Sequence, residues 1–185
     1  AVKISQNENL QVKTENEITI AQTNINGKRS LRSIYSPEKT HLTYDDVQKS
    51  SSRRVYCPGP LTIDHEHQVV TLQGIADHAD LEDSQVYLED VLGEMYADHV
   101  TIFYQWEKGR FAPKKVLLEG GVRLINRFIG HIEEAGSVLH RAIADRVEYS
   151  PEESEMILSA SDGNRVLFFD TVNNIQMSAP SLKVQ

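Results

Sequence analysis

Apolar and polar residues alternate with a period of two over most of the second half of this chain. The clearest run places Val100, Ile102, Tyr104 and Trp106 on one face of a strand, with polar or aromatic residues between them. Similar short runs follow, separated by turn signals such as Asp162-Gly163-Asn164. Many short strands joined by turns predict an all-β sandwich, jelly roll or barrel.

One short phrase occurs three times within these runs: Ala97-Asp98-His99-Val100, Ala144-Asp145-Arg146-Val147 and Ala179-Pro180-Ser181-Leu182. The copies start 47 and then 35 residues apart (144 − 97 and 179 − 144), so a solenoid of fixed period is disfavoured. We expect Ala97 and Ala144 to mark matching strand starts. We expect Ala179 to begin a terminal strand that is available for pairing.

The sequence also predicts the connections between strands. Gly120-Gly121 is interpreted as a hairpin turn, residues 50–54 as an exposed loop, and residues 61–64 with 68–72 as a hairpin. Two stretches, 77–95 and 127–142, have apolar spacings that suit either a helix or a strand. Because their neighbours are strands, strands or loops are favoured for both.

Composition limits the classes of partner. A chain of 185 residues can form one domain with a substantial core or two small ones, and its net charge is −8. Residues 77–98 contain eight carboxylates and no Lys or Arg, so duplex nucleic acid is excluded as a partner. No apolar run is long enough to cross a bilayer as a helix.

The first residues lack a signal-peptide or transit pattern. We therefore expect either a cytosolic protein or a chain from which a leader has been removed. The single cysteine, Cys57, excludes an internal disulfide and is expected to be a small, semi-buried apolar residue.

The sharpest enzymatic candidate is His65-Glu66-His67. In a strand the two imidazoles would point the same way and could share a metal ion. With Gly59 upstream, the segment half-matches the cupin metal signature, but the glutamate expected after the second histidine and a third histidine are missing. An exposed polar face of a hairpin is the preferred interpretation.

Other catalytic patterns are absent from the sequence. Asp98-His99 and Asp77-His78 have no serine in a nucleophile-elbow context, and no glycine-rich phosphate loop occurs. Adjacent acidic pairs such as Glu152-Glu153 would point to opposite sides of a strand. We therefore predict a protein that is not an enzyme and that needs no cofactor or metal.

The repeated phrases carry a family resemblance. Residues 142–158, Asn164 to Asp170 and Ile175 to Ala179 resemble the OstA-like family of periplasmic lipopolysaccharide-transport proteins, above all in the phrase Ala144-Asp145-Arg146-Val147-Glu148-Tyr149, and residues 97–124 give a second copy. The family comprises a bridge protein, its inner-membrane partner and the N-terminal domain of the translocon. The resemblance covers residues 94–185, and residues 1–93 match loosely within a single domain of 1–185.

What the resemblance implies is an all-β, open twisted β-jelly roll, in which two splayed antiparallel sheets enclose a hydrophobic interior. It also implies that the protein works in the periplasm, where it binds lipopolysaccharide or lipid A and shields the acyl chains during transport to the outer membrane. Its implied partners are other lipopolysaccharide-transport proteins and further copies of itself, joined head to tail by edge-strand pairing.

Strand parity nominates the residues that would line such an interior, although a one-residue slip in register would exchange the two faces. The nominated lipid-binding residues are Val100, Ile102, Tyr104, Val116, Leu118, Val122, Leu124, Val147, Tyr149, Met156, Leu158, Val166, Phe168 and Met177. Arg123, Arg127 and Arg141 are expected at a rim, where they would meet lipid phosphates.

Two alternatives remain open from the sequence. One is a structural or adaptor β-domain with a closed core, which binds partner proteins through its edge strands. The other is a cupin-like metal enzyme that uses His65 and His67.

Overall fold

The computed structural model describes residues 2–6, 10–14, 17–25, 28–46, 51–75, 81–90, 93–107, 110–126 and 140–184. Within these ranges, seventeen strands form one hydrogen-bonded system, and every pairing between strands is antiparallel. One four-residue helix, α1 (Leu81–Ser84), lies between β8 and β9. The all-β prediction is confirmed.

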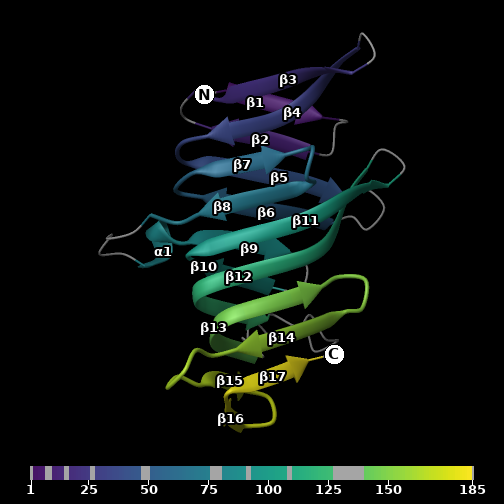
Figure 1. The fold of residues 1–185 in the computed structure, drawn as a ribbon. Coiled ribbons are helices and arrows are strands. Elements are labelled where there is room, and N and C mark those ends of the chain that lie inside the picture. The colour runs from purple at the N-terminus through teal and green to yellow at the C-terminus, as the bar shows by residue number, and fades with distance from the viewer. Residues whose placement is uncertain are drawn as a thin grey trace.

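The pairings divide the strands into two sheets that face each other (Figure 1). The back sheet runs in the order β1 (Val2–Gln6), β2 (Leu10–Thr14), β5 (Thr40–Asp46), β6 (Ser51–Cys57), β9 (Val86–Asp90), β10 (Gly93–Ala97), the second half of β12 (Arg110–Asn126), the first half of β13 (His140–Ser150), β15 (Val166–Asp170) and β16 (Ile175–Ala179).

The front sheet uses the remaining strands and the other halves of the two long ones. Its order is β3 (Thr19–Ile25), β4 (Lys28–Ser36), β7 (Leu61–Asp64), β8 (Val69–Gln73), β11 (His99–Glu107), the first half of β12, the second half of β13, β14 (Glu155–Ser159) and β17 (Ser181–Val184). Two facing antiparallel sheets that are not closed into a barrel form the predicted open jelly roll.

The chain crosses between the sheets repeatedly along one side, which we call the seam. Backbone hydrogen bonds join successive crossings there: Gly59 N donates to Gln73 O at 3.1 Å, Gly74 N to Asp98 O at 2.6 Å, and Asp98 N to Gly120 O at 3.0 Å. Most of the turns between paired strands lie on the opposite side, which we call the mouth. The two sheets are therefore fastened to each other along the seam.

The Ala-x-x-apolar phrase marks this seam. Ala97 ends β10 in the back sheet, and β11 starts in the front sheet two residues later; Ala179 and β17 repeat the arrangement. Ala144 lies within β13, which pairs with β15 before this point and with β14 after it. The prediction that the alanines start strands was wrong, because each is the last inward-facing residue before a crossing.

Two other local predictions also fail. Gly120-Gly121 is not a hairpin turn: both glycines have positive φ (78° and 52°), and β12 passes through them from the front sheet to the back sheet. A Cβ on Gly120 would lie 2.4 Å from Asp98 Oδ2, so a glycine is required at this bend. Residues 51–54, expected as a loop, belong to β6.

The ambiguous stretch 77–95 contains α1, β9 and most of β10 in its described part, and the hairpin of 61–64 with 69–73 is present as β7 and β8. Residues 127–139, including Arg127, lie outside the described residues, as do Asp77 and His78.

Candidate functional site

The space between the two sheets is lined by rows of side chains that follow the cross-strand register. Beside the seam, the front sheet contributes mainly leucines and the back sheet contributes mainly small or β-branched residues. The front seam row is Leu61, Leu72, Val100, Leu118, Val147 and Leu158. The back seam row is Thr14, Thr40, Cys57, Val86, Ala97, Val122, Ala144 and Val166.

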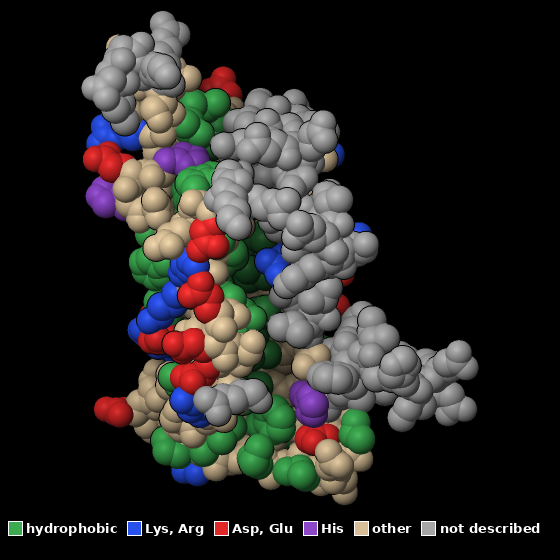
Figure 2. All heavy atoms as spheres, turned by 90° about the vertical axis from the view of Figure 1, so that its right-hand side faces the viewer, with side chains coloured by type: hydrophobic (Ala, Val, Ile, Leu, Met, Phe, Trp, Pro, Cys, Tyr) green, Lys and Arg blue, Asp and Glu red, His purple; other side chains and the backbone are tan. Residues whose placement is uncertain are grey.

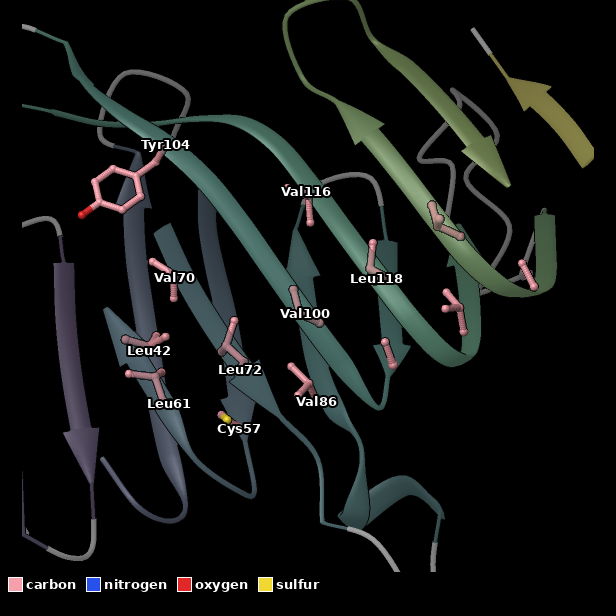
Figure 3. Close-up of a cluster of buried hydrophobic side chains, with 14 of the residues drawn as sticks. Leu42, Cys57, Leu61, Val70, Leu72, Val86, Val100, Tyr104, Val116 and Leu118 are labelled. Atoms are coloured by element: carbon pink, nitrogen blue, oxygen red, sulfur yellow. The ribbon is translucent and has the colours of Figure 1, made fainter. Parts of the chain in front are cut away.

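Both seam rows are almost completely shielded from solvent. Figure 3 shows Leu72 and Val100 from the front sheet pointing toward Cys57 and Val86 from the back sheet. Large side chains opposite small ones allow the sheets to approach closely without leaving voids. Side chains next to the seam therefore form a closed core that is apolar except at its N-terminal end, where Thr14 and Thr40 share hydrogen bonds with Ser36.

The next row outward on each sheet, two residues farther from the seam, is also apolar. On the front sheet this mouth row is Ile34, Ile63, Val70, Ile102, Val116, Tyr149 and Met156. On the back sheet the mouth row is Leu42, Val55, Leu88, Met95, Leu124, Ala142, Phe168 and Met177.

Exposure in the mouth rows increases toward the C-terminal end. Ile34, Ile63, Val70 and Leu42 are buried, whereas Leu124, Tyr149 and Met156 are only partly covered. Met177, on the last strand of the back sheet, is 43% exposed. Figure 2, which faces the mouth, shows hydrophobic side chains reaching the surface along this side. The interior is thus closed at the seam and partly accessible at the mouth.

All fourteen residues that the sequence analysis nominated as lipid-binding face the space between the two sheets. Strand parity therefore selected the inner face of each strand. Val100, Leu118, Val122, Val147, Leu158 and Val166 belong to the seam rows. Ile102, Val116, Leu124, Tyr149, Met156, Phe168 and Met177 belong to the mouth rows, and Tyr104 lies one step beyond them but is buried.

Sequence reasoning missed the interior residues of the first half, including Leu42, Val55, Leu88 and Met95. On these strands single apolar residues alternate with polar ones such as Thr43 and Arg54, which occupy the outer face. The signal was present in the period-two spacing, as in Val55 and Cys57, but the runs are short and follow a serine-rich segment.

The arginines expected at the rim lie elsewhere. Arg123 is on the outer face of the back sheet, where its guanidinium lies 4.6 Å from the centre of the Tyr96 ring and donates to Gln85 Oε1 at 3.0 Å. Arg141 is exposed on the same outer face, opposite Ile125. The prediction for these two residues was wrong, because both alternate out of phase with the interior row Leu124 and Ala142.

A cluster of aromatic rings closes the mouth near the β7–β8 turn. The Tyr104 ring lies 4.6 Å from the Phe111 ring, and the Trp106 ring stacks on His65 at 6.1 Å. Tyr104 Oη and His65 Nδ1 are 3.0 Å apart. Burial lowers the pKa of His65 and raises the pKa of Tyr104 to about 12.

His67, two residues from His65, has a different environment. It is exposed, and its Nδ1 lies 2.8 Å from Asp64 Oδ2, which raises the pKa of His67 and lowers that of Asp64. Residues 65–68 form a turn instead of a strand, so the expected alignment of two imidazoles does not occur. Across the described ranges, no group of three or more metal-ligating side chains is present.

Cys57 has no features of a reactive thiol. Its Sγ lies 3.3–3.4 Å from three backbone carbonyl oxygens at the seam, those of Gly59, Pro60 and Gln73. Burial raises its pKa to about 11, so the thiol stays protonated at neutral pH.

The outer faces of the two sheets differ in character. The front sheet carries ion pairs, among them Arg146 with Glu119 at 2.9 Å and Lys115 with Glu148 at 2.6 Å. The back sheet carries a cross-strand row that begins with three tyrosines and continues into aliphatic residues: Tyr56, Tyr87, Tyr96, Arg123, Ile143 and Leu167.

No protein-family model matches the chain, and no curated protein sequence matches it either. In the portion that the structure describes, no helix combines the length and the apolar character needed to cross a bilayer.

Proposed function

We propose that this protein binds the acyl chains of lipopolysaccharide in its interior and shields them from water during transport across the periplasm. The observation that supports this proposal is the pair of mouth rows, which present partly exposed apolar side chains from both sheets toward the same space. Apolar surface that stays partly accessible on the inner faces of two sheets is suited to a long hydrocarbon chain.

The energetics need no catalytic group. Transfer of an acyl chain from water to an apolar surface is worth about 0.8 kcal/mol for each methylene group. Met95 and Met156, on opposite sheets, have flexible and polarizable side chains that adapt to chains of different shape. A long apolar interior therefore binds lipid tails by burial alone.

We further propose that molecules stack end to end, with copies of the chain or with other lipopolysaccharide-transport proteins. Among the described strands, β1 and β3 at one end and β16 and β17 at the other each pair with a single neighbour. An edge strand with free backbone groups can pair with a strand of a second molecule. Stacking through these edges would extend the apolar interior from one molecule into the next.

Site-specific photo-crosslinking tests the lipid-binding proposal with matched controls. A photoreactive residue at Ile102 or Phe168 is expected to crosslink to lipopolysaccharide, because both side chains lie in the mouth rows. The neighbouring positions Phe103 and Leu167 are on the outer faces of the same strands and are expected to give no lipid adduct. Equal labelling at inner and outer positions, or no labelling at either inner position, would contradict the proposal.

A closed-core adaptor that binds proteins is the second candidate. The observation that favours it is the row of partly exposed tyrosines and Arg123 on the outer face of the back sheet, which continues into the exposed Ile143 and Leu167, since Tyr and Arg are enriched in protein interfaces. In the same experiment, an adaptor would give protein adducts at Leu167 and none with lipid at Ile102.

A further inference from the structure

We propose that the N-terminal part of the mouth contains an anion site, in which Arg53 and His65 bind the phosphate group of an amphiphile. This inference rests on the proposed function, because the site lies where a headgroup would emerge from the interior. It adds a polar recognition element to a surface that otherwise binds hydrocarbon.

Arg53 faces the interior, in contrast to its neighbour. It shares the inner face of β6 with Val55 and Cys57, whereas Arg54 points outward and forms an ion pair with Glu89. The Nε atom of Arg53 is buried and has no hydrogen-bond partner. A buried guanidinium nitrogen without an acceptor is costly, and an anionic ligand would supply the acceptor.

His65, at the end of β7 in the front sheet, also has a buried nitrogen without a hydrogen-bond partner. Its Nδ1 is 3.0 Å from the Tyr104 hydroxyl, while its Nε2 is buried and has no partner. When the Tyr104 hydroxyl donates to Nδ1, the imidazole proton lies on Nε2, which then becomes a donor without an acceptor. Trp106 stacks on the ring and fixes its orientation.

Arg53 and His65 are separated from the seam by the same number of residues, one on each sheet. Cys57 on β6 and Leu61 on β7 are both fully buried, and the chain crosses from the back sheet to the front sheet between them. Arg53 lies four residues before Cys57, and His65 lies four residues after Leu61. At about 3.3 Å per residue, Arg53 lies roughly 13 Å from the seam on the back sheet, and His65 directly follows the end of β7 on the front sheet.

On the front-sheet side of the site, three carboxylates near His65 and Trp106 already have partners. Asp64 binds His67 and accepts from the backbone of its own turn, Glu66 pairs with Arg32 at 3.1 Å, and Glu107 pairs with Lys114 at 2.5 Å. A phosphate group fits the two remaining nitrogens because it offers several acceptor oxygens in different directions and full charge for the guanidinium.

The test uses two amphiphiles with the same alkyl chain, octyl phosphate and octyl glucoside, each below its critical micelle concentration. Trp106 is the one tryptophan of the chain, so its fluorescence reports binding beside His65. Arg53→Gln and His65→Gln are each expected to raise the Kd for octyl phosphate about tenfold or more while changing that for octyl glucoside less than about twofold. The matched controls Arg54→Gln and His67→Gln are expected to leave both Kd values within about twofold.

Inorganic phosphate identifies the source of the anion. Displacement of octyl phosphate by inorganic phosphate at similar concentrations would support a site for free phosphate, and much weaker displacement would support a lipid headgroup. A measurement on the unaltered protein complements the variants, since octyl phosphate is expected to raise the pKa of His65 in an NMR titration and octyl glucoside is not.

Two outcomes overturn the anion site: equal affinity of the unaltered protein for both amphiphiles, or equal effects of Arg53→Gln and Arg54→Gln. In both cases binding of octyl glucoside would leave the proposed function intact. If neither octyl phosphate nor octyl glucoside binds, the proposed function is rejected together with the anion site.

Discussion

The seam and the mouth of this molecule are built from similar apolar side chains, yet their surroundings differ. Leu118 and Leu124 belong to the same strand and both face the interior, but Leu118 is fully buried and Leu124 is partly exposed. Leu118 lies where the sheets are joined by backbone hydrogen bonds, whereas Leu124 lies farther from that line. For these two leucines, distance from the seam and not residue type separates a side chain of the core from one that is available to a ligand.

Truncation of these two leucines gives the largest expected effect. Leu118→Ala is expected to lower the free energy of unfolding by about 2–5 kcal/mol, because it leaves a cavity in a closed core. Leu124→Ala is expected to cost about 1 kcal/mol, because less surface is buried and solvent can reach the vacated space. Urea denaturation measures both, and equal losses would show that the mouth is packed as tightly as the seam.

The second prediction compares two glycines with positive φ, Gly120 at the bend in β12 and Gly163 in an open turn. Gly120→Ala is expected to destabilise the protein by about 1–3 kcal/mol, because a Cβ at φ 78° would collide with the Asp98 carboxylate. Gly163→Ala is the matched control, since φ is 87° there but no atom lies within 4 Å of the added Cβ. It is expected to cost only about 1 kcal/mol, the conformational part of the effect. Thermal unfolding of the two variants separates the collision from the strain.

The turns at the mouth are expected to tolerate glycine better than the strands do. Gln68, Ser154 and Asn174 each end a four-residue turn with φ near 50°. Gln68→Gly is expected to stabilise the protein by up to about 1 kcal/mol, because it relieves a left-handed conformation. Gln73→Gly, in the adjoining strand β8, is expected to destabilise it by a similar amount. A loss of stability in Gln68→Gly would show that the left-handed conformation of Gln68 holds no strain that glycine can relieve.

The smallest expected effect concerns the two histidines of this turn. His65 is expected to titrate below pH 6.5, because burial disfavours its charged form, and His67 above pH 6.5, because Asp64 favours it. The contribution of His67 to stability is therefore present below pH 6.5 and lost as the pH rises through its folded-state pKa. For His65 the sign is opposite, and stability is lost as the pH falls from 6.5 toward its lower folded-state pKa.

NMR titration of the two imidazoles measures this separation directly. His67→Gln should abolish the higher titration and leave that of His65 unchanged. Coincident titrations would show that His65 is as exposed to water as His67.

Much of the fold was accessible from pattern alone. Alternation in residues 100–106 and 147–149 predicted both the strands and the face that turns inward, because a period of two leaves only two choices. The weaker pattern of residues 51–57 failed, since a serine-rich start with two arginines has the composition of a loop. Pairing with β5 and β9 on both sides makes it a strand.

The candidate site was predicted in part. Residues on the inner faces of β11 to β16 followed from parity. Arg53 was missed because its segment was interpreted as a loop, and His65 was considered only as a metal ligand in a strand, whereas it lies in a turn. Arg123 and Arg141 were assigned to the rim from charge alone, and the register placed them on the outside.

Side-chain alternation was enough to predict that this protein is made of strands and which side of each strong strand is apolar, since both are local properties of the chain. Only the tertiary structure decided where those strands join. It turned Gly120-Gly121 from an apparent hairpin into a bend between sheets, and it placed the small residue of each repeated Ala phrase at the seam. The physical reason is that burial depends on how closely two sheets approach, a distance set by hydrogen bonds between residues far apart in the chain.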